Sequence, residues 1–576
     1  MDRESWDVRL EVVQPGSLVR IQAHYVAEDL GEEVARTDSG VTVALSDSAG
    51  AEQTRIHARR LVLDHRADRL SLAGEVSVAA GDSLAATADS LVWDGAASQV
   101  LFPDWVLIEM PDGSERCRQL RAGLALGAWS AHDVDAVWAA GQGSEEVRVR
   151  ALSEQARRGP HLWVEYIQPD VEYAGLRVTS AAAHYDEAGR RMEFEGQVSG
   201  VDSGLTLAAQ RAAVDLDTRR VVAQGQARLQ GEDFALQAQE VEQVLGDSLV
   251  EARGEPVVYS QGDRRIQAPR LVYDRRAEAL RAGRGVELWD GERRLVCRDL
   301  VYERKAGRAW AEGGVALRAP EFTGSLTAGR LLFDLDRQRV ELEEEPALRR
   351  AAAAGDSLRV YAGSMALDLA ARTLTGADTF AVESARVSLR ARRGRYRAEG
   401  EVLEAVEHAV LEHRQPEDDV HTRVGADSVV VYLEDGAVQR VVLPGHVEGW
   451  VQSGAGRTHW VEGQCGGVAF AGEVLQRFTL AEGADATHRD LERDEVSRFR
   501  GREMAMHFGG SGRIERVVVT GDARLTARLR QGQEEGGAAL SEVSGQELEI
   551  LFTEGRIAQV IVDQNIQGRY LPERKP

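Results

Sequence analysis

The stretch RLVYDRRAEALRAGRGVELWDGERRLVCRDLVYERKAGRAWAEGGVAL, residues 270–317, contains two nearly equal copies of one pattern. Each copy opens with Leu-Val-Tyr and an acid, Asp274 or Glu303, and returns as apolar residues around a glycine and a valine. A period of about 30 residues is typical of repeat proteins, in which one small unit stacks on the next. The acids that align along the chain are Asp64, Asp94, Asp186, Asp215, Asp274, Glu303 and Asp334.

Apolar and polar residues alternate within each copy, which is typical of β-strands with one buried face. In ARRLVLDHRADRLSLAGEVSV, residues 58–78, Leu61 and Leu63 alternate with Arg60 and Asp64 before the turn, and Leu70, Leu72, Val76 and Val78 lie at every second position after it. About five polar residues separate the acid from the returning strand, a hairpin length in which the acid can accept N–H groups of the turn. Each copy therefore predicts a strand, a turn and a strand.

A two-stranded unit is only marginally stable alone, so we expect the units to pair edge to edge and to turn their apolar faces toward each other. The predicted fold is all-β, an elongated jellyroll of stacked antiparallel strand-turn-strand repeats with a continuous apolar interior. Strand parity does not distinguish a filled core from an open groove. The residues predicted to line the interior are Leu61, Leu63, Leu70, Leu72, Val76, Leu91, Trp93, Tyr185, Leu271, Tyr273, Leu300, Tyr302, Leu331 and Phe333.

Composition excludes several classes of function. The 576 residues carry a formal charge of −24, which disfavours a nucleic-acid partner because phosphate contacts need a basic face. Cys117, Cys297 and Cys465 lie far apart and form no CxxC pair, so we predict no metal site, and a disulfide between two of them stays open. The start of the sequence is polar, without a visible signal peptide or anchor, and no apolar run approaches the roughly 20 residues of a membrane span.

The repeat lapses in three places, which predicts the domain organisation. The polar segment 141–160 lacks a strand period and predicts a linker or a short helix. A second interruption around 341–358 predicts a boundary, and 407–423 predicts a long exposed loop. The expected domains are therefore 1–140, 161–345 and 346–576.

Sequences that resemble catalytic motifs are better explained as turns. Gly-Asp-Ser-Leu occurs three times, with Ser83, Ser248 and Ser357, and Asp485-Ala486-Thr487-His488 could complete a serine esterase. Because the tetrapeptide recurs before alternating runs, we interpret it as a turn and predict that the protein is not an enzyme. We also interpret the histidines 408, 413 and 421, near Asp418 and Asp419, and the arginine-rich run 390–400 as solvated surface rather than as a metal or head-group site.

The unit A-x-x-L-x-(aromatic)-D…L-x-L-x-G-x-V-x-V, as in APRLVYDRRAEALRAGRGVEL, resembles the OstA-like repeat of the lipopolysaccharide-transport family that includes LptA, LptC and the N-terminal part of LptD. Residues 1–140 are similar to an LptC-type domain. The two later segments, residues 161–345 and 346–576, are similar to LptA-like arrays. The resemblance implies a β-taco that binds the acyl chains of lipid A and moves lipopolysaccharide across the periplasm without catalysis or a cofactor. It implies partners of the same transport family, joined head to tail at edge strands.

The sequence also departs from this family. It has several arrays in tandem. The anchor typical of LptC, the signal peptide typical of LptA and the barrel typical of LptD are all absent from the sequence given. The resemblance implies the periplasm and leaves association with the outer membrane open. The alternative is a structural β-scaffold that assembles end to end without lipid.

Overall fold

The computed structural model describes residues 2–14, 17–47, 51–81, 84–123, 126–140, 145–322, 324–351, 357–415, 420–434, 437–453, 457–471, 474–491, 495–530, 538–553 and 556–572. These residues form β-strands joined by turns, and none of them lies in a helix. The described part of the chain accordingly offers no helix that could cross a bilayer. The chain divides into two compact units, Met1–Ala282 and Gly283–Pro576, each described by itself.

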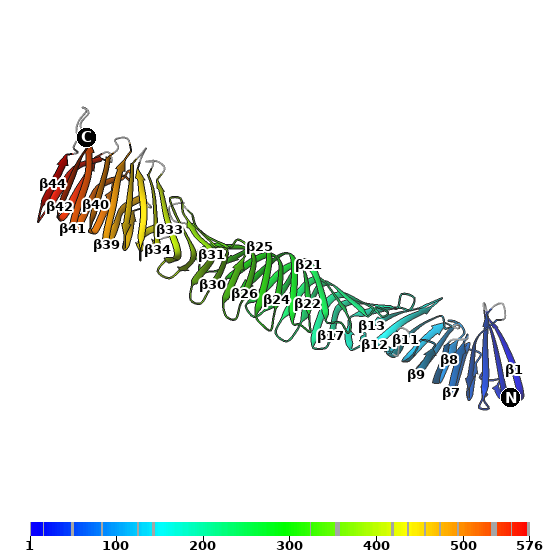
Figure 1. Cartoon of the computed structure of the whole chain (residues 1–576). Helices are drawn as coiled ribbons and strands as arrows, with labels where there is room; N and C mark the ends of the chain where they lie inside the picture. Colours follow the sequence, from blue (N-terminus) through cyan, green and yellow to red (C-terminus); the bar gives the residue numbers. More distant parts are fainter. Residues whose placement is uncertain are drawn as a thin grey trace. The chain divides into compact units, whose positions relative to one another are not determined.

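Consecutive strands of each unit lie side by side (Figure 1). The strands of unit 1 are β1 Asp2–Gln14, β2 Ser17–Asp29, β3 Val34–Thr37, β4 Val41–Asp47, β5 Glu52–Ala58, β6 Arg60–Asp64, β7 Arg69–Ala80, β8 Leu84–Asp94, β9 Gln99–Met110, β10 Gly113–Gly123, β11 Ala128–Ala140, β12 Glu145–Arg158, β13 Leu162–Ile167, β14 Asp170–Tyr173, β15 Leu176–Thr179, β16 Ala182–Asp186, β17 Arg191–Asp202, β18 Leu205–Asp215, β19 Arg220–Gln230, β20 Ala235–Val244, β21 Leu249–Gln261 and β22 Arg264–Asp274. Strand β23, Ala279–Asp290, contains the division between the units.

The strands of unit 2 are β24 Arg293–Glu303, β25 Arg308–Arg318, β26 Ser325–Asp334, β27 Arg339–Glu343, β28 Ala347–Ala351, β29 Ser357–Tyr361, β30 Ser364–Asp368, β31 Thr373–Glu383, β32 Val387–Arg397, β33 Val402–Gln415, β34 Val420–Glu434, β35 Ala437–Leu443, β36 Val447–Ser453, β37 Arg457–Gly463, β38 Cys465–Ala471, β39 Val474–Asp490, β40 Glu495–Phe508, β41 Ile514–Arg530, β42 Ala538–Thr553, β43 Arg556–Asp563 and β44 Gln567–Pro572. Neighbouring strands pair antiparallel, as β24 does with β25 and β25 with β26.

Most long strands bend near their middle, where the hydrogen-bond register slips by a bulge. In β7 the slip lies between Ala73 and Val76, and Gly74 and Glu75 there have positive φ angles of 81° and 50°. A bulge with left-handed residues turns the strand sharply. Each bent strand thus contributes one half to each of two facing layers.

We call these layers leaf A and leaf B. Leaf A holds the strand halves that meet at the turns after the aligned acids, such as Asp64–Arg69, and leaf B holds the opposite halves, such as those joined at Ala80–Leu84. The row of bends is the spine. The opposite border, where the hairpin turns of the two leaves lie, is the lip.

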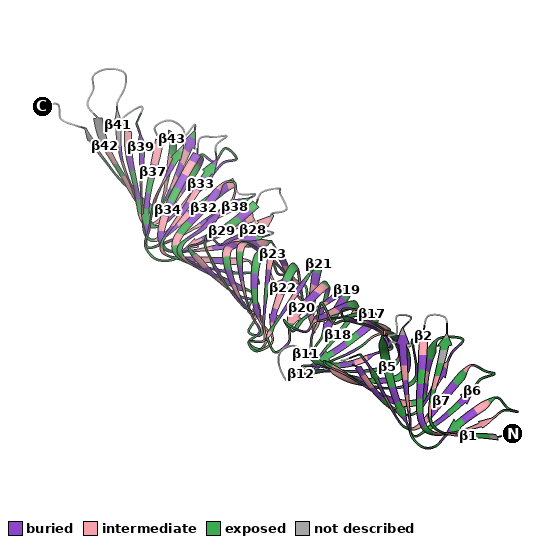
Figure 2. Ribbon diagram, turned by 90° about the vertical axis from the view of Figure 1, so that its right-hand side faces the viewer, coloured by how far each residue is buried: buried purple, intermediate pink, exposed green. Residues whose placement is uncertain are grey.

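Burial alternates along the strands, with one face of each leaf buried and the other exposed or half-buried (Figure 2). In β25, for example, Ala309, Ala311, Val315 and Leu317 are all buried. The buried faces of the two leaves form the interior of each unit. The prediction of an all-β fold built from stacked antiparallel strand-turn-strand repeats is confirmed.

The aligned acids stabilise the turns of leaf A, as the loop length predicts. Asp274 Oδ1 accepts the N–H groups of Arg276 and Ala277 at 2.9 and 3.1 Å, and Asp334 Oδ1 accepts that of Arg337 at 3.0 Å. These backbone hydrogen bonds lower the pKa of both carboxyls. The repeated acid is therefore a turn-forming residue.

Removal of one of these acids tests that role. Asp215 Oδ1 accepts both the N–H and the hydroxyl of Thr218, at 2.8 and 2.7 Å. We expect Asp215→Ala to lower the unfolding free energy by about 1 kcal/mol, because two turn donors lose their acceptor. Asp217→Ala is the control in the same turn, since it removes an exposed ion pair with Arg190 that contributes about 0–1 kcal/mol. Chemical denaturation of the two variants should separate them, and equal losses would contradict the assignment.

Two sequence predictions about interruptions are wrong. Segment 141–160, expected as a linker or short helix, contains strand β12, which pairs with β11 and with both β13 and β14; residues 141–144 lie outside the described residues. Segment 407–423, expected as a long exposed loop, belongs to β33 up to Gln415 and to β34 from Val420, with 416–419 outside the described residues. In both segments, some buried positions hold a small or a polar residue, such as Ala156 and His413. These residues hide the alternation of apolar and polar residues that would have predicted a strand. The domain division at 140, 160 and 345 stays a prediction.

Candidate functional site

The interior between the leaves is the site that the sequence pattern predicts, and the structure places every predicted residue in it. All fourteen side chains, from Leu61 to Phe333, are 5% exposed or less. All but Val76 belong to leaf A, because the acid that marks the repeat follows the leaf A strand halves. The facing wall in leaf B, which the sequence analysis missed, includes Val106, Ile108, Val147, Val257 and Leu317.

The interior is filled. The extended apolar faces of the two leaves bury each other, and large side chains such as Trp93, Tyr302 and Phe333 are at most 1% exposed. A ligand between the leaves must therefore separate them. The spine resists this separation because the backbone passes from one leaf to the other there, whereas only side-chain and turn contacts join the leaves at the lip.

Polar contacts close the lip of unit 1 between turns that are far apart in sequence. Arg275, in a leaf A turn, donates from Nη1 to Asp202 Oδ2, in a leaf B turn, at 2.8 Å, and the side chains are only 20% and 14% exposed. Tyr173 of leaf B donates its hydroxyl to the carbonyl of Leu216 in a leaf A turn at 2.7 Å. These contacts are hydrogen bonds and an ion pair, which can break and re-form.

Aromatic rings close the same lip. Phe234, from a leaf B turn, packs on Tyr273 of leaf A with ring centroids 4.9 Å apart. Trp138 of leaf B stacks on Tyr185 of leaf A at 5.8 Å. Tyr185 and Tyr273, both predicted as lining residues, therefore contact the opposite leaf at the border of the interior.

The lip of unit 2 is closed by similar pairs. Arg350 of leaf B donates to the hydroxyl of Tyr396 at 3.0 Å and to Glu401 at 2.5 Å, both in leaf A. His413 of leaf B packs on Phe470 of leaf A with centroids 5.4 Å apart. Each unit thus has a spine that the backbone crosses and a lip held by non-covalent contacts.

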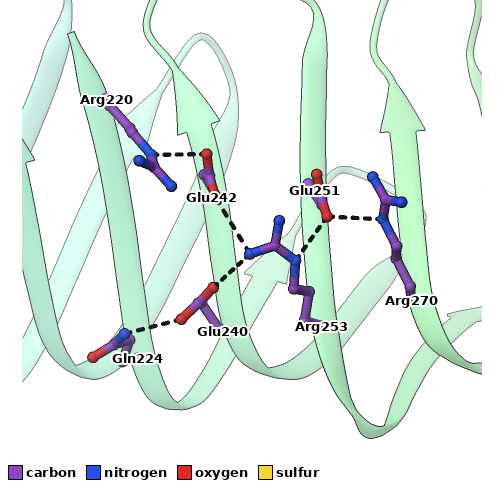
Figure 3. Close-up of polar contacts among 7 residues, drawn as sticks. All are labelled: Arg220, Gln224, Glu240, Glu242, Glu251, Arg253 and Arg270. Atoms are coloured by element: carbon purple, nitrogen blue, oxygen red, sulfur yellow. Dashed lines mark hydrogen bonds and ion pairs between the residues drawn. The ribbon is translucent and has the colours of Figure 1, made fainter. Parts of the chain in front are cut away.

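A network of charged side chains lies on the outer face of leaf A across strands β19 to β22 (Figure 3). Arg253 pairs with Glu240 at 3.2 Å and with Glu251 at 2.8 Å, and Glu251 also pairs with Arg270 at 2.8 Å. Burial acts to raise the pKa of Glu251, but the two arginines lower it below its usual value. The outer face of leaf A is therefore polar at these strands.

The residues of the esterase-like motif do not come together. Asp485 and His488 lie three apart on β39, and strand residues at that spacing point to opposite faces. Asp485 faces outward and pairs with Arg498 and Arg500, whereas His488 is buried, which lowers its pKa to about 4. The N–H of Ser248 donates to the neighbouring Asp247 at 2.6 Å in a turn, as the sequence interpretation predicts. Ser83 lies outside the described residues.

The histidines 408, 413 and 421 do not converge either. His408 is exposed at a bend, His413 is buried, and His421 packs on Trp450. Among the described residues, no group of three or more His, Cys, Asp or Glu side chains is placed to hold a metal ion; Asp418 and Asp419 are outside them. The arginine run 390–400 pairs in part with Glu404 and Glu407, which fits a solvated face. All three cysteines are free.

Comparison with known proteins finds a structural neighbour for part of the chain. No family model and no curated protein matches the chain. A matching solved structure is that of LptH from Pseudomonas aeruginosa, described as the LptA-homologous periplasmic component of the lipopolysaccharide transport device. The two are 15% identical, the match covers 24% of this chain and 82% of LptH, and the TM-score is 0.14. A TM-score this low does not establish a common function.

Proposed function

We propose that the protein binds the acyl chains of lipopolysaccharide between its two leaves and carries this lipid across the periplasm without catalysis. The observation that supports the proposal is an extended apolar interior bordered on one side by a lip that only non-covalent contacts close. Such a border can open along its length, which suits a ligand with long apolar chains and a large polar head. The polar head would stay in water outside the lip.

The energies are compatible with such opening. A hydrogen bond between charged groups contributes about 1.5 to 3 kcal/mol, so a half-buried contact such as that of Arg275 with Asp202 holds the lip by no more than a few kcal/mol. Each methylene moved from water into an apolar interior contributes about 0.8 kcal/mol. An acyl chain of about ten methylenes can therefore offset several lip contacts and the local loss of packing between the leaves.

The edge strands support the second part of the proposal, which is head-to-tail assembly with other lipopolysaccharide-transport proteins. Among the described residues, β1 pairs with β2 alone, and β43 and β44 both pair with β42. A strand with a free edge can add a strand of a partner. Trp6, on β1, is 66% exposed and would be covered by such a partner.

Photocrosslinking tests the lipid-binding interior. A photoreactive phenylalanine analogue replaces Tyr273 or Phe333, which point inward, and Val272 or Leu332, which are their neighbours on the outer face. After incubation with lipopolysaccharide and irradiation, we expect labelling of lipid at the two inward positions, at least about tenfold above the outward controls, because only the interior reaches acyl chains. Equal labelling at the two faces would contradict the proposal.

The filled interior favours a second candidate function, a structural scaffold that assembles end to end. Leu70, Leu271 and Val340 are already fully buried without a ligand, as in an ordinary core. Native mass spectrometry of protein purified from a lipopolysaccharide-producing host distinguishes the candidates. A co-purifying lipid A species supports transport, and a mass that stays free of lipid after incubation with lipopolysaccharide supports the scaffold.

A further inference from the structure

Two acidic side chains meet in the interior of unit 1. Glu115 on β10 is 0% exposed and Glu154 on β12 is 1% exposed. The register places them in different leaves: Glu115 pairs with Ala136 beyond the bend of β10, and Glu154 pairs with Ala131 on the other side of the bend of β11. The two carboxyls thus approach each other across the space between the leaves, within hydrogen-bonding reach.

These carboxyls have no basic partner among the groups that act on them. Trp129 donates its indole N–H to Glu154 Oε1 at 2.6 Å, and the Cys117 thiol is the other polar neighbour of Glu115. Both oxygens of Glu115 and Oε2 of Glu154 lack a donor when both groups are ionised. Two bare carboxylates in an apolar interior repel, so one must be protonated and donate to the other.

The surroundings reinforce this state. Burial raises the pKa of Glu115, and burial followed by the charge of Glu115 raises that of Glu154. The other titratable groups that interact with the pair are Cys117 on β10 and Tyr166 on β13, and the pKa of each is raised, chiefly by burial. All of these groups are uncharged at neutral pH, so none of them supplies the missing positive charge.

A second polar contact crosses the interior beside the carboxyl pair. Trp138 of leaf B donates its indole N–H to the hydroxyl of Tyr166 in leaf A at 2.9 Å. Tyr166 lies opposite Glu154 in the β12–β13 register, so the two contacts are neighbours. Together they join the leaves inside the apolar space, whereas the lip contacts join them only at its border.

We propose that Glu115 and Glu154 form a proton-sharing bridge that divides the interior of unit 1 into two lipid-binding compartments, one on each side of the bridge. The inference rests on the proposed function. An acyl chain that entered here would have to separate a buried hydrogen-bonded pair and leave both carboxyls unpaired in an apolar space, which costs more than breaking a lip contact, whose groups reach water when the lip opens. Lipid would therefore occupy the interior around Trp93 and around Tyr185 but not the space beside the bridge.

The test compares lipid labelling at three interior positions of the full chain. Val149 lies beside the bridge, because it pairs with Ala136, the residue that Glu115 pairs with on the other side. A photoreactive phenylalanine analogue replaces Trp93, Val149 or Tyr185, which are all buried, in three backgrounds: native, Glu115→Gln/Glu154→Gln, and Glu115→Leu/Glu154→Leu. After incubation with lipopolysaccharide, we expect labelling at Val149 to be at least about tenfold below that at Trp93 in the native and Gln backgrounds. In the Leu background, Val149 should be labelled as strongly as Trp93.

The outcomes separate the two proposals. Strong labelling at Val149 in the native background overturns the division while the proposed function stands. Absence of labelling at all three positions in every background overturns the proposed function and the division with it. The Gln variant keeps the shape of the two side chains and their hydrogen bonds. It is therefore the control for a folding defect in the Leu variant.

A pH titration of stability tests the shared proton without lipid. Because both folded pKa values are raised, the unfolded chain loses these protons at lower pH than the folded chain. The stabilisation of the folded state by the pair is complete at pH values below 4.5, the pKa of a glutamate side chain in the unfolded chain, and it is lost as the pH rises. As the pH rises above 4.5, the unfolding midpoint of the native protein should fall relative to that of Glu115→Gln/Glu154→Gln. If the unfolding midpoints of the two proteins changed with pH in the same way, the carboxyls would not share a proton.

Discussion

A chemical bridge across the lip of unit 1 is expected to abolish lipid labelling beside it. Asp202→Cys and Arg275→Cys place thiols where the native ion pair joins the two leaves, and a short, thiol-cleavable bismaleimide links them. An acyl chain adds a layer about 4 to 5 Å thick between the leaves, which linked turns cannot accommodate. We expect the amount of lipid crosslinked by the photoreactive residue at position 273 to fall at least about tenfold in the bridged protein. It should return to the unbridged level when a reducing agent cleaves the bridge.

The native cysteines do not interfere with this experiment. Cys117 and Cys297 are buried, and burial raises the pKa of both thiols, that of Cys297 to about 12, so neither forms the reactive thiolate at neutral pH. Cys465 is half-buried and is replaced by serine. Each single-cysteine variant, treated with the same reagent, controls for the modification itself. Undiminished labelling in the bridged protein would show that lipid does not enter by separation of the leaves.

A charge on the apolar face is expected to unfold the repeat that carries it, whereas the same charge one residue along is tolerated. Leu300 is 2% exposed inside unit 2, and Val301, the next residue of β24, is 37% exposed on the outer face. We expect Leu300→Asp to destabilise its surroundings by about 3 to 5 kcal/mol, because it removes a packed side chain and buries a carboxylate without a partner. Val301→Asp should change stability by less than about 1 kcal/mol.

The measurement has to resolve individual repeats, since stacked repeats open locally rather than as one unit. Hydrogen exchange of the β24, β25 and β26 amides reports this opening directly. Protection should fall in all three strands for Leu300→Asp and stay near the native level for Val301→Asp. A similar loss of protection in both variants would mean that the two faces of β24 are equally buried.

Strand parity predicted the interior well because it depends on nearest neighbours alone. Each strand points alternate residues to opposite faces, so Leu300 and Val301 are separated by geometry that any strand imposes. The turns were equally predictable, since an aspartate accepts N–H groups two and three residues later, as Asp274 does. Parity failed in β12 and β33, where Ala156, Glu154 and His413 occupy buried positions that usually hold larger apolar residues.

The sequence by itself determined the class of fold, the turn residues and the inward face of leaf A, because each follows from contacts between residues close along the chain. Only the tertiary structure decided what faces that layer. Three pairs join the two leaves: Arg275 with Asp202, 73 residues apart, Phe234 with Tyr273, 39 apart, and Glu115 with Glu154, also 39 apart. No rule based on neighbouring residues selects these partners. The closed lip and the internal bridge exist because bulges fold each strand back over its neighbours, which brings two separate rows of turns and two distant acids together.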